Sequence, residues 1–260
     1  MTAKPTIIVI TNRKGGTGKT TTAVNLAAEF AASGERTLLI DLDTQGHCAL
    51  GLGLKIGDGQ PTAHSLFGAP EAAAGMALTD AIVQTGWERL DLVPGAPDFR
   101  HDTAPNEDQI LVRAFSDPAI VAGYDRILID SPPSLDRLLL SALAAAHWAL
   151  IPFVPHPLSN EGVRQLARVF FRVAMSSNAD LRLLGLLPVM LDSRIVQHRR
   201  VREQVIGQFG QARLLGGIRN DIKLAEAFAV GRPIRDYAPR SRGNQDYRTA
   251  FSNLHARLLG

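Results

Sequence analysis

Residues 6–22 read TIIVITNRKGGTGKTTT, and this stretch decides the fold. The first six residues (6–11) are all β-branched, which predicts a short buried strand. Residues 12–18 then form a glycine-rich turn, and residues 19–33 are expected to form a helix that ends at Gly34. Where a glycine-rich turn connects a strand to a helix, the backbone N–H groups of the turn and the N-terminus of the helix can bind phosphate.

Short apolar runs alternate with helical stretches along the rest of the chain. Strands are expected at 37–40, 90–93, 127–129, 148–154, 183–191 and 214–218; helices at 107–116, 135–146, from Ser159 onward, at 196–208 and at 243–258. Residues 44–75 have no clear period and are expected to be loop and short helix. This alternation predicts an α/β fold, a mostly parallel twisted sheet with helices on both faces. No linker divides the chain, so residues 1–260 are expected to form a single domain.

The glycine-rich turn matches a specific phosphate-binding pattern. The general form G-x-x-x-x-G-K-[ST] would place its first glycine at Arg13, so that form is not met. The deviant form K-G-G-x-G-K-[ST] is met. We therefore expect nucleotide phosphates to be bound by Lys14, Gly15, Gly16, Thr17, Gly18, Lys19, Thr20 and Thr21. Lys19 would neutralise the β- and γ-phosphates, and the Thr20 hydroxyl would bind Mg²⁺.

Carboxylates follow two of the predicted strands. Asp41 and Asp43 come at the end of the second strand, and Asp130 ends the strand at 127–129. Ligands in such sheets bind beyond the carboxyl ends of the strands, where the glycine-rich turn also lies. Thr20, Asp41 and Asp130 are the predicted metal-site residues, with Asp130 reaching Mg²⁺ through water. The sequence thus predicts an Mg-ATP site.

Composition limits the other classes of function. The single cysteine, Cys48, excludes an internal disulfide, and neither Cys48 nor His47 has a partner at metal-ligand spacing, so no zinc site is expected. The sequence has no signal peptide and no membrane-spanning run, which favours a cytoplasmic protein.

Charge is unevenly divided along the chain. Residues 1–160 hold 11 Lys+Arg against 17 Asp+Glu, whereas residues 161–260 hold 17 against 8. A basic face favours a polyanion, either nucleic acid or an anionic membrane. A solvated arginine-rich surface would give the same counts, so the composition alone leaves the choice open.

Several ordered segments resemble the ParA/MinD family of deviant Walker A (SIMIBI-type) ATPases. They are residues 12–22, 39–46 (LIDLDTQG), 129–135 (IDSPPSL), 160–162, 191–194, 219–227 (RNDIKLAEA), 231–234 and 241–243. The sequence is most similar to the short ParA/Soj branch, which has no added N-terminal DNA-binding domain. Arg13, Thr17, Thr44 and His47 replace the commoner Gln, Val, Pro and Asn, and none of these changes removes a required chemical group.

The resemblance implies roles for individual residues. Members dimerise around two ATP molecules, and Lys14 matches the lysine that reaches the partner's phosphates. Asp43 matches the carboxylate needed for hydrolysis, so Lys14, Lys19 and Asp43 are the expected catalytic residues. Asn220 matches a contact to the adenine edge. Hydrolysis is usually stimulated by a partner protein, and turnover without it is expected to be slow.

ATP-bound dimers of the ParA branch bind DNA without sequence preference. Arg194 and Lys223 match two basic positions used for this purpose, and Arg199, Arg200 and Arg242 add cations nearby. Such cations contact phosphates and release counterions, which gives salt-sensitive binding. The resemblance therefore implies a nucleoid-associated ATPase that partitions or positions a cargo, whether a replicon, a protein cluster or a microcompartment.

Three rival functions follow from the same loop. A MinD-like membrane protein would use the C-terminal helix, but only Arg248, His255 and Arg257 are basic there. A relative of the nitrogenase iron protein would need several cluster-ligating cysteines. A binding module without hydrolysis is disfavoured because the expected catalytic lysines and aspartates are all present.

Overall fold

The computed structural model describes residues 4–68, 76–99, 107–156, 168–170 and 172–259. One seven-stranded sheet runs through the protein in the order β3-β4-β2-β5-β1-β6-β7. All pairings are parallel except that of β3 with β4. The strands are β1 (Thr6–Ile10), β2 (Thr37–Asp41), β3 (Val83–Gln84), β4 (Leu90–Val93), β5 (Arg126–Asp130), β6 (Trp148–Phe153) and β7 (Arg182–Pro188). The predicted α/β class and the mostly parallel sheet are confirmed.

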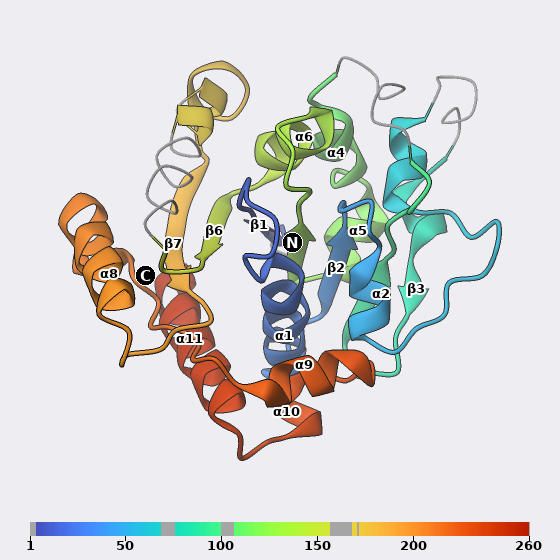
Figure 1. Cartoon of the computed structure of the whole chain (residues 1–260). Coiled ribbons are helices and arrows are strands. Elements are labelled where there is room, and N and C mark those ends of the chain that lie inside the picture. Colours follow the sequence, from blue (N-terminus) through green and yellow to red (C-terminus); the bar gives the residue numbers. More distant parts are fainter. Residues whose placement is uncertain (1–3, 69–75, 100–106, 157–167, 171, 260) are drawn as a thin grey trace.

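Helices cover both faces of the sheet (Figure 1). One face carries α1 (Lys19–Ala32), α2 (His47–Gly51), α9 (Ile222–Ala229), α10 (Ile234–Tyr237) and α11 (Arg242–Leu259). The opposite face carries α4 (Ile110–Ala114), α5 (Pro118–Gly123) and α6 (Arg137–Ala145). Helix α8 (Val196–Phe209) packs near the β7 edge, and short 3₁₀ turns occur at Ala63–Phe67, Leu78–Ala81 and Gln211–Arg213.

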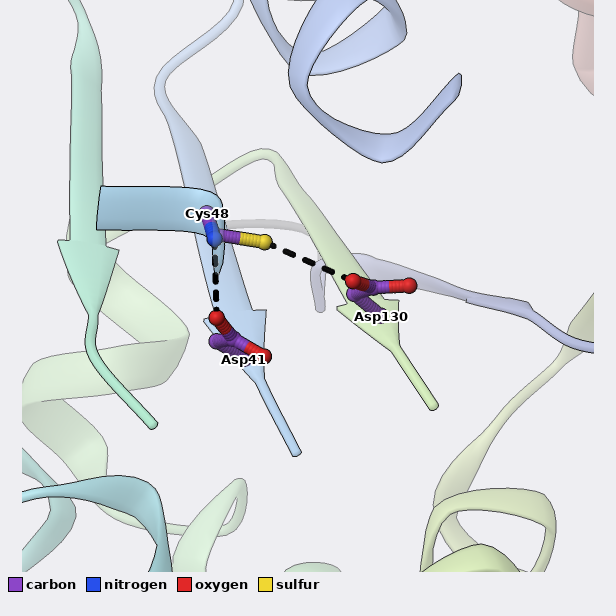
Figure 2. Close-up of side chains that lie close together, drawn as sticks. All are labelled: Asp41, Cys48 and Asp130. Atoms are coloured by element: carbon purple, nitrogen blue, oxygen red, sulfur yellow. Dashed lines mark hydrogen bonds between the residues drawn. The ribbon is translucent and has the colours of Figure 1, made fainter. Parts of the chain in front are cut away.

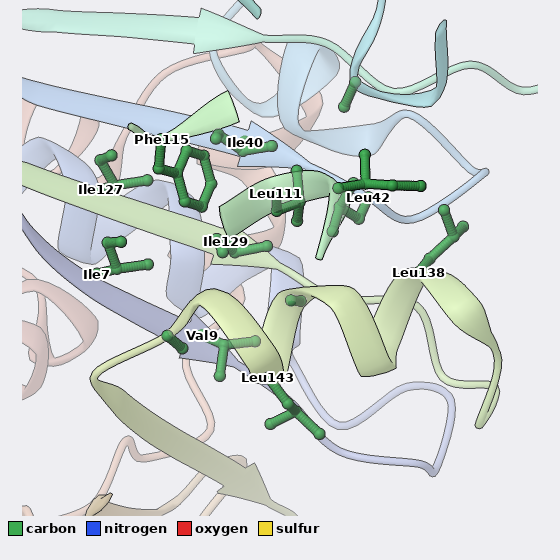
Figure 3. Packing of buried hydrophobic residues seen from close by; sticks show 14 of the residues in the cluster. Ile7, Val9, Ile40, Leu42, Leu111, Phe115, Ile127, Ile129, Leu138 and Leu143 are labelled. Atoms are coloured by element: carbon green, nitrogen blue, oxygen red, sulfur yellow. The ribbon is translucent and has the colours of Figure 1, made fainter. Parts of the chain in front are cut away.

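The β-branched run in β1 divides its side chains between the two faces. Ile7 and Val9 belong to the core under α4 and α6, which Figure 3 shows from close by, whereas Ile8 and Ile10 belong to the core under α1. Side chains alternate across a strand, so a central strand covered on both faces must be apolar throughout. This is why the sequence shows a continuous apolar run at β1 and not an alternating pattern.

The predicted strand at 214–218 is wrong. Residues Leu214 and Arg219 make only isolated bridges, to Leu186 and Leu191, and do not form a strand. Gly216 in this segment has φ of 105°, a conformation outside the β region that interrupts a regular ladder. The segment 44–75 contains the short helix α2 and a 3₁₀ turn, as expected, while the helix start expected at Ser159 lies outside the described residues.

Helix α11 docks on α1 through its apolar positions. Tyr247, Ala250 and Leu254 are each about 1% exposed, and the Tyr247 hydroxyl lies 3.2 Å from Thr22 Oγ1. Phe251 contacts Phe30 edge-on, with ring centroids 5.0 Å apart. The amphipathic face that a membrane role would need is therefore occupied within the fold. In the described parts of the chain, no helix is long and apolar enough to cross a bilayer.

Candidate nucleotide site

The glycine-rich turn lies between the carboxyl end of β1 and the first residue of α1. Gly16 and Gly18 have φ of 70° and 71°, a left-handed conformation that glycine adopts without steric cost. Gly18 also lies close to β7, since a Cβ there would be 3.5 Å from the Val189 side chain. The turn therefore has the strand–turn–helix geometry that the motif predicts, with α1 starting directly at Lys19.

Two buried side chains tie the base of this loop. Asn12 Nδ2 donates to the Pro152 carbonyl at 2.8 Å, and Asn12 Oδ1 accepts from Lys14 N at 3.0 Å. Thr17 Oγ1 donates to the Lys14 carbonyl at 3.1 Å. Asn12 and Thr17 are 4% and 2% exposed, whereas Lys14 is exposed. Both backbone polar groups of Lys14 are thus held from inside the protein while its side chain faces solvent.

A cavity of about 630 Å³ opens above the loop, a volume within the usual range for small-molecule sites. Its floor is residues 15–21, and one wall is made by Asp43, Thr44, Gln45 and His47. The remaining lining residues are Pro132, Pro133, Ser134, Met190 and Phe228. Asn220 and Lys14 lie outside this lining. Asn220 is beside the wall, because its backbone N–H donates to the carbonyl of Leu191, next to Met190.

Asp41 and Asp130 lie side by side behind the cavity floor, because β2 and β5 pair in register at these residues. Both are completely buried. Asp41 uses its two oxygens to hold the following turn: Oδ1 accepts from Asp43 N at 3.0 Å and Oδ2 from Cys48 N at 2.9 Å (Figure 2). The geometry thus gives Asp41 a structural task, namely to place Asp43 at the cavity.

Asp130 differs from Asp41 in how its oxygens are used. Oδ2 accepts a hydrogen bond from Cys48 Sγ at 3.6 Å, but Oδ1 has no hydrogen-bond partner among the described residues. Burial raises the pKa of Asp130 to about 7, while the Thr20 hydroxyl and the Lys19 charge act to lower it. A buried carboxylate oxygen without a partner is costly unless a cation binds it.

Cys48 has partners that the sequence spacing did not reveal. Ligand atoms of Asp41, Cys48 and Asp130 all lie within 4.8 Å of one another, a grouping that comes from the fold and not from spacing in the sequence. Burial and the two carboxylates raise the pKa of the Cys48 thiol well above its usual range. A protonated thiol is a poor ligand, and Mg²⁺ prefers oxygen. The residues that fit Mg²⁺ are therefore Asp130, through Oδ1, and Thr20. Asp41, the third predicted metal-site residue, already uses both oxygens to accept backbone N–H groups.

Lys19 and Asp43, two of the expected catalytic residues, both line the cavity. Lys19 is 6% exposed and lines the cavity, near enough to Asp130 for its charge to act on that carboxylate. Asp43 also lines the cavity and is half-buried; its Oδ1 accepts from Gln45 N at 3.1 Å. One buried cation and one accessible carboxylate thus face the same space.

Met190 and Phe228 also line the cavity, and neither lies in the segments that carry the family resemblance. Met190 follows β7 with φ of 51°, a conformation rare for a residue with a side chain, and it is 47% exposed. Its position just past a strand end could have indicated the cavity. Phe228 comes from α9, a helix of eight residues that the sequence pattern did not reveal, and no signal in the sequence placed it at the nucleotide site.

The predicted DNA-binding cations lie around the end of β7 and its neighbours. Arg194 pairs with Asp192 at 2.7 Å and Lys223 with Glu226 at 2.6 Å, and all four side chains are at least one-quarter exposed. Arg199 and Arg200 are exposed on α8, and Arg242 is exposed at the start of α11.

One carboxylate joins two of these cations in space. Asp221 accepts from Lys223 N at 3.1 Å and from Gly243 N at 2.9 Å, which brings the N-termini of α9 and α11 together. Lys223 and Arg242 therefore lie on one surface. Segment 192–194 adjoins it, because Leu191 forms a bridge with Arg219.

Comparison with known proteins points to one family. A family model described as an AAA domain matches residues 5–183. The chain is 37% identical over 258 residues to the chromosome-partitioning ATPase Soj of Thermus thermophilus, covering 98% of each chain. It is 37% identical over 250 residues to the chromosome partitioning protein ParA of Myxococcus xanthus, covering 93% of this chain and 84% of that one.

A solved structure shares the whole fold. Cobyrinic acid a,c-diamide synthase from Mycobacterium smegmatis, with bound ATP analog and magnesium, superposes with a TM-score of 0.80 at 28% identity, covering 98% of this chain and 95% of that one. One conclusion follows from the deviant phosphate loop, the paired strand-end aspartates and the 37% identity to Soj over nearly the full length of the chain. The chain belongs to the ParA/Soj family of chromosome-partitioning ATPases.

Proposed function

We propose that this protein hydrolyses Mg-ATP slowly, dimerises when ATP is bound, and in that form binds double-stranded DNA without sequence preference. The observation that carries the proposal is the cavity above the glycine-rich loop, with Lys19 and Asp43 facing it and the unpartnered Asp130 Oδ1 buried behind it. Hydrolysis would return the protein to a form that leaves DNA, so the bound nucleotide acts as a switch.

Each group in the cavity has a separate task in this account. Lys19 neutralises charge on the β- and γ-phosphates, and the N–H groups of the loop bind their oxygens. Thr20 and Asp130 would hold Mg²⁺, which supplies Lewis-acid stabilisation of the phosphate charge. Asp43 is accessible at the cavity wall and would orient the attacking water. Asp41 keeps Asp43 there through the turn that it caps.

Lys14 acts from a second copy of the chain. Its side chain is exposed and lies outside the lining of its own cavity, so it is available to a partner's phosphates. A cation delivered in trans stabilises the charge that develops during phosphoryl transfer, and such groups have large effects on the rate. Hydrolysis would therefore require the dimer, and Asn220, beside the cavity wall, would contact the adenine edge.

DNA binding is supported by the exposed cations of α8, α9 and α11. Arg199 and Arg200 project from α8, and Lys223 and Arg242 share the surface at Asp221. The ion pairs of Arg194 and Lys223 do not oppose this, because exposed pairs contribute little stability and a DNA phosphate can replace the carboxylate. Two copies in a dimer would double the number of phosphate contacts.

The cargo and the stimulating partner follow from the family. The names of the relatives in Thermus and Myxococcus refer to chromosome partitioning, which favours a replicon as cargo over a protein cluster or microcompartment. A partner protein bound to that cargo would stimulate hydrolysis. The protein would then work in the cytoplasm, on the nucleoid, and residues 1–260 would act as one unit.

Duplex DNA binding with ATP, ADP and no nucleotide tests this function. We expect binding with ATP only, and about 10-fold or more weaker binding at 200 mM than at 50 mM salt, because several phosphate contacts release counterions. The double variant Arg199→Glu/Arg200→Glu should reduce binding by at least that factor. Lys19→Ala removes the phosphate contact, so this variant should not bind DNA even when ATP is present.

A matched control separates local contacts from overall charge. Arg172→Glu/Arg182→Glu reverses the same number of exposed arginines near the opposite end of β7, so it should leave DNA affinity within about twofold. Equal losses in both double variants would mean that net charge alone governs binding. DNA binding that ignores the nucleotide, or none at all, would contradict the switch and direct the test to anionic liposomes.

A further inference from the structure

The tip of the phosphate loop is not held by packing. A Cβ built at Gly15 or Gly16 would meet no atom of the described residues within 4 Å, and both glycines are exposed. Glycines in open space keep wide conformational freedom, because no side chain or neighbour restricts them. Lys14 directly precedes this tip, so its direction must be fixed by contacts at the base of the loop.

Those contacts are two hydrogen bonds, one to each backbone polar group of Lys14. Asn12 Oδ1 accepts from the Lys14 N–H at 3.0 Å, and Thr17 Oγ1 donates to the Lys14 carbonyl at 3.1 Å. Both side chains are nearly fully buried, whereas Lys14 is exposed, so the two hydrogen bonds join the exposed backbone to the protein interior. The Lys14 backbone is therefore fixed in orientation, although its side chain is exposed.

Asn12 also connects this arrangement to the sheet. Its amide nitrogen donates to the carbonyl of Pro152 in β6 at 2.8 Å, so the acceptor that holds Lys14 N–H cannot rotate freely. Thr17 stands where the family more often has Val, a residue of the same shape without a hydroxyl. In this chain the hydroxyl supplies a hydrogen bond that Val could not make.

We propose that Asn12 and Thr17 are positioning residues for Lys14: they hold its backbone so that the ammonium group meets the partner subunit's phosphates in the ATP-bound dimer. The inference rests on the proposed function of Lys14 in trans and adds the residues that orient it. A lysine held in place loses less conformational entropy when it reaches the phosphates, so the benefit appears in the dimer. Nucleotide binding to a single copy should not depend on it.

Thr17→Val is the direct test, because it removes one hydroxyl and keeps the shape. We expect kcat for ATP hydrolysis to fall about fivefold, the size of one lost hydrogen bond. The affinity of the monomer for a fluorescent ATP analogue should change less than twofold. It is measured at protein concentrations too low for the protein to dimerise. Thr17→Ser keeps the hydroxyl and should restore most of kcat.

Two controls make the result specific. Thr37→Val removes a hydroxyl of the same kind, from a buried threonine whose Oγ1 donates to the Glu35 carbonyl at 3.0 Å at the far end of β2. It should leave kcat unchanged. In a Lys14→Ala background, Thr17→Val should cause no further loss, because there is no lysine left to position.

The outcomes separate this inference from the proposed function. Hydrolysis that depends on Lys14 but is unaffected by Thr17→Val would overturn the inference alone. The inference would also fail by itself if Thr17→Val lowered kcat equally with and without Lys14, or lowered monomer nucleotide affinity as much as kcat. Hydrolysis that does not depend on Lys14 would overturn the proposed function and this inference together.

Discussion

At Asp130, burial of the carboxylate lowers the stability of the nucleotide-free protein, although the same carboxylate is needed to hold Mg²⁺ in the proposed function. Its charge is buried, its Oδ1 has no hydrogen-bond partner among the described residues, and burial raises its pKa to about 7. A raised pKa in the folded state means that its contribution to stability is complete below the unfolded value, near 4, and is lost as pH rises through about 7. The nucleotide-free protein therefore becomes less stable towards alkaline pH.

Asp130→Asn should stabilise the nucleotide-free protein at pH 8. We expect Tm with EDTA to rise by several degrees relative to wild type, since about 1 kcal/mol corresponds to roughly 2–4 °C at this size. The difference should shrink towards pH 5, where the carboxyl is protonated. Stabilisation by Mg-ATP should be lost in the same variant. Thermal melts at the two pH values, with EDTA or with Mg-ATP, measure both effects.

Asp41→Asn is the contrasting control. Asp41 accepts backbone N–H groups on both oxygens, and Asn can accept on only one, so this variant should lower Tm at pH 8. If Asp130→Asn also lowered Tm at pH 8, the unpartnered oxygen would not be the source of instability, and the assignment of Asp130 to Mg²⁺ would lose its physical basis.

Residue spacing was enough to predict the loop but not the groups around it. Residues 15–21 and Asp43 line the cavity as expected, because a contiguous motif sets its own local geometry. The grouping of Cys48 with Asp41 and Asp130 depends on how far α2 turns back over β2. That distance is set by tertiary packing, so no pattern in the sequence encodes it.

The backbone segments that follow α2 and α9 lie in close contact. Gly53 follows α2 and Gly231 follows α9, and a Cβ built at Gly231 would lie 2.3 Å from Gly53 Cα. Phe228 of α9 packs on the same helix, since a Cβ at Gly51 would be 2.7 Å from its ring. This contact joins the turn after Asp43 to the helix that begins beside Lys223, and so connects the nucleotide cavity with the basic surface.

Gly231→Ala should be strongly destabilising because the contact is backbone against backbone. Gly59→Ala is a matched control, as Gly59 also has positive φ (78°, against 67° at Gly231) but has no described atom within 4 Å of its Cβ position. We expect the free energy of unfolding to fall by about 1 kcal/mol at Gly59 and by at least about 2 kcal/mol more at Gly231. Urea denaturation measures both, and equal losses would mean that the two helices separate easily.

The elements were predicted best where the sequence pattern was long. The parallel strands of the sheet and helices α1, α6, α8 and α11 correspond to expected segments, whereas the two-residue strand β3 was not predicted. The strand at 214–218 failed because the glycine at 216 interrupts pairing, and helices α9 and α10 were missed because they have only eight and four residues. Such short helices are stabilised mainly by docking, which leaves little periodicity to read.

At the scale of the whole molecule, residues 1–160 and 161–260, which differ in net charge, form different parts of the fold. The acidic part supplies the strands of the nucleotide site; the basic part supplies β7 and α8 at one edge of the sheet, and α9 and α11 below it in the view of Figure 1. The counts indicated an excess of basic residues in this part of the chain, but they could not predict that Arg194 and Lys223 are paired with carboxylates. Pairing depends on side-chain geometry that only the fold determines.

The central claim is that two copies complete one another's sites, and subunit mixing tests it most directly. Lys14→Ala and Asp43→Ala should each retain only a small residual ATPase rate alone. If Lys14 acts in trans, a mixed dimer has one complete site, formed by Asp43 of the Lys14→Ala copy and Lys14 of the other. An equimolar mixture should then recover about a quarter of the wild-type ATPase rate, since half of the dimers are mixed and each has one working site. A mixture no more active than its separate components would show that Lys14 does not act across the dimer, and would contradict the account.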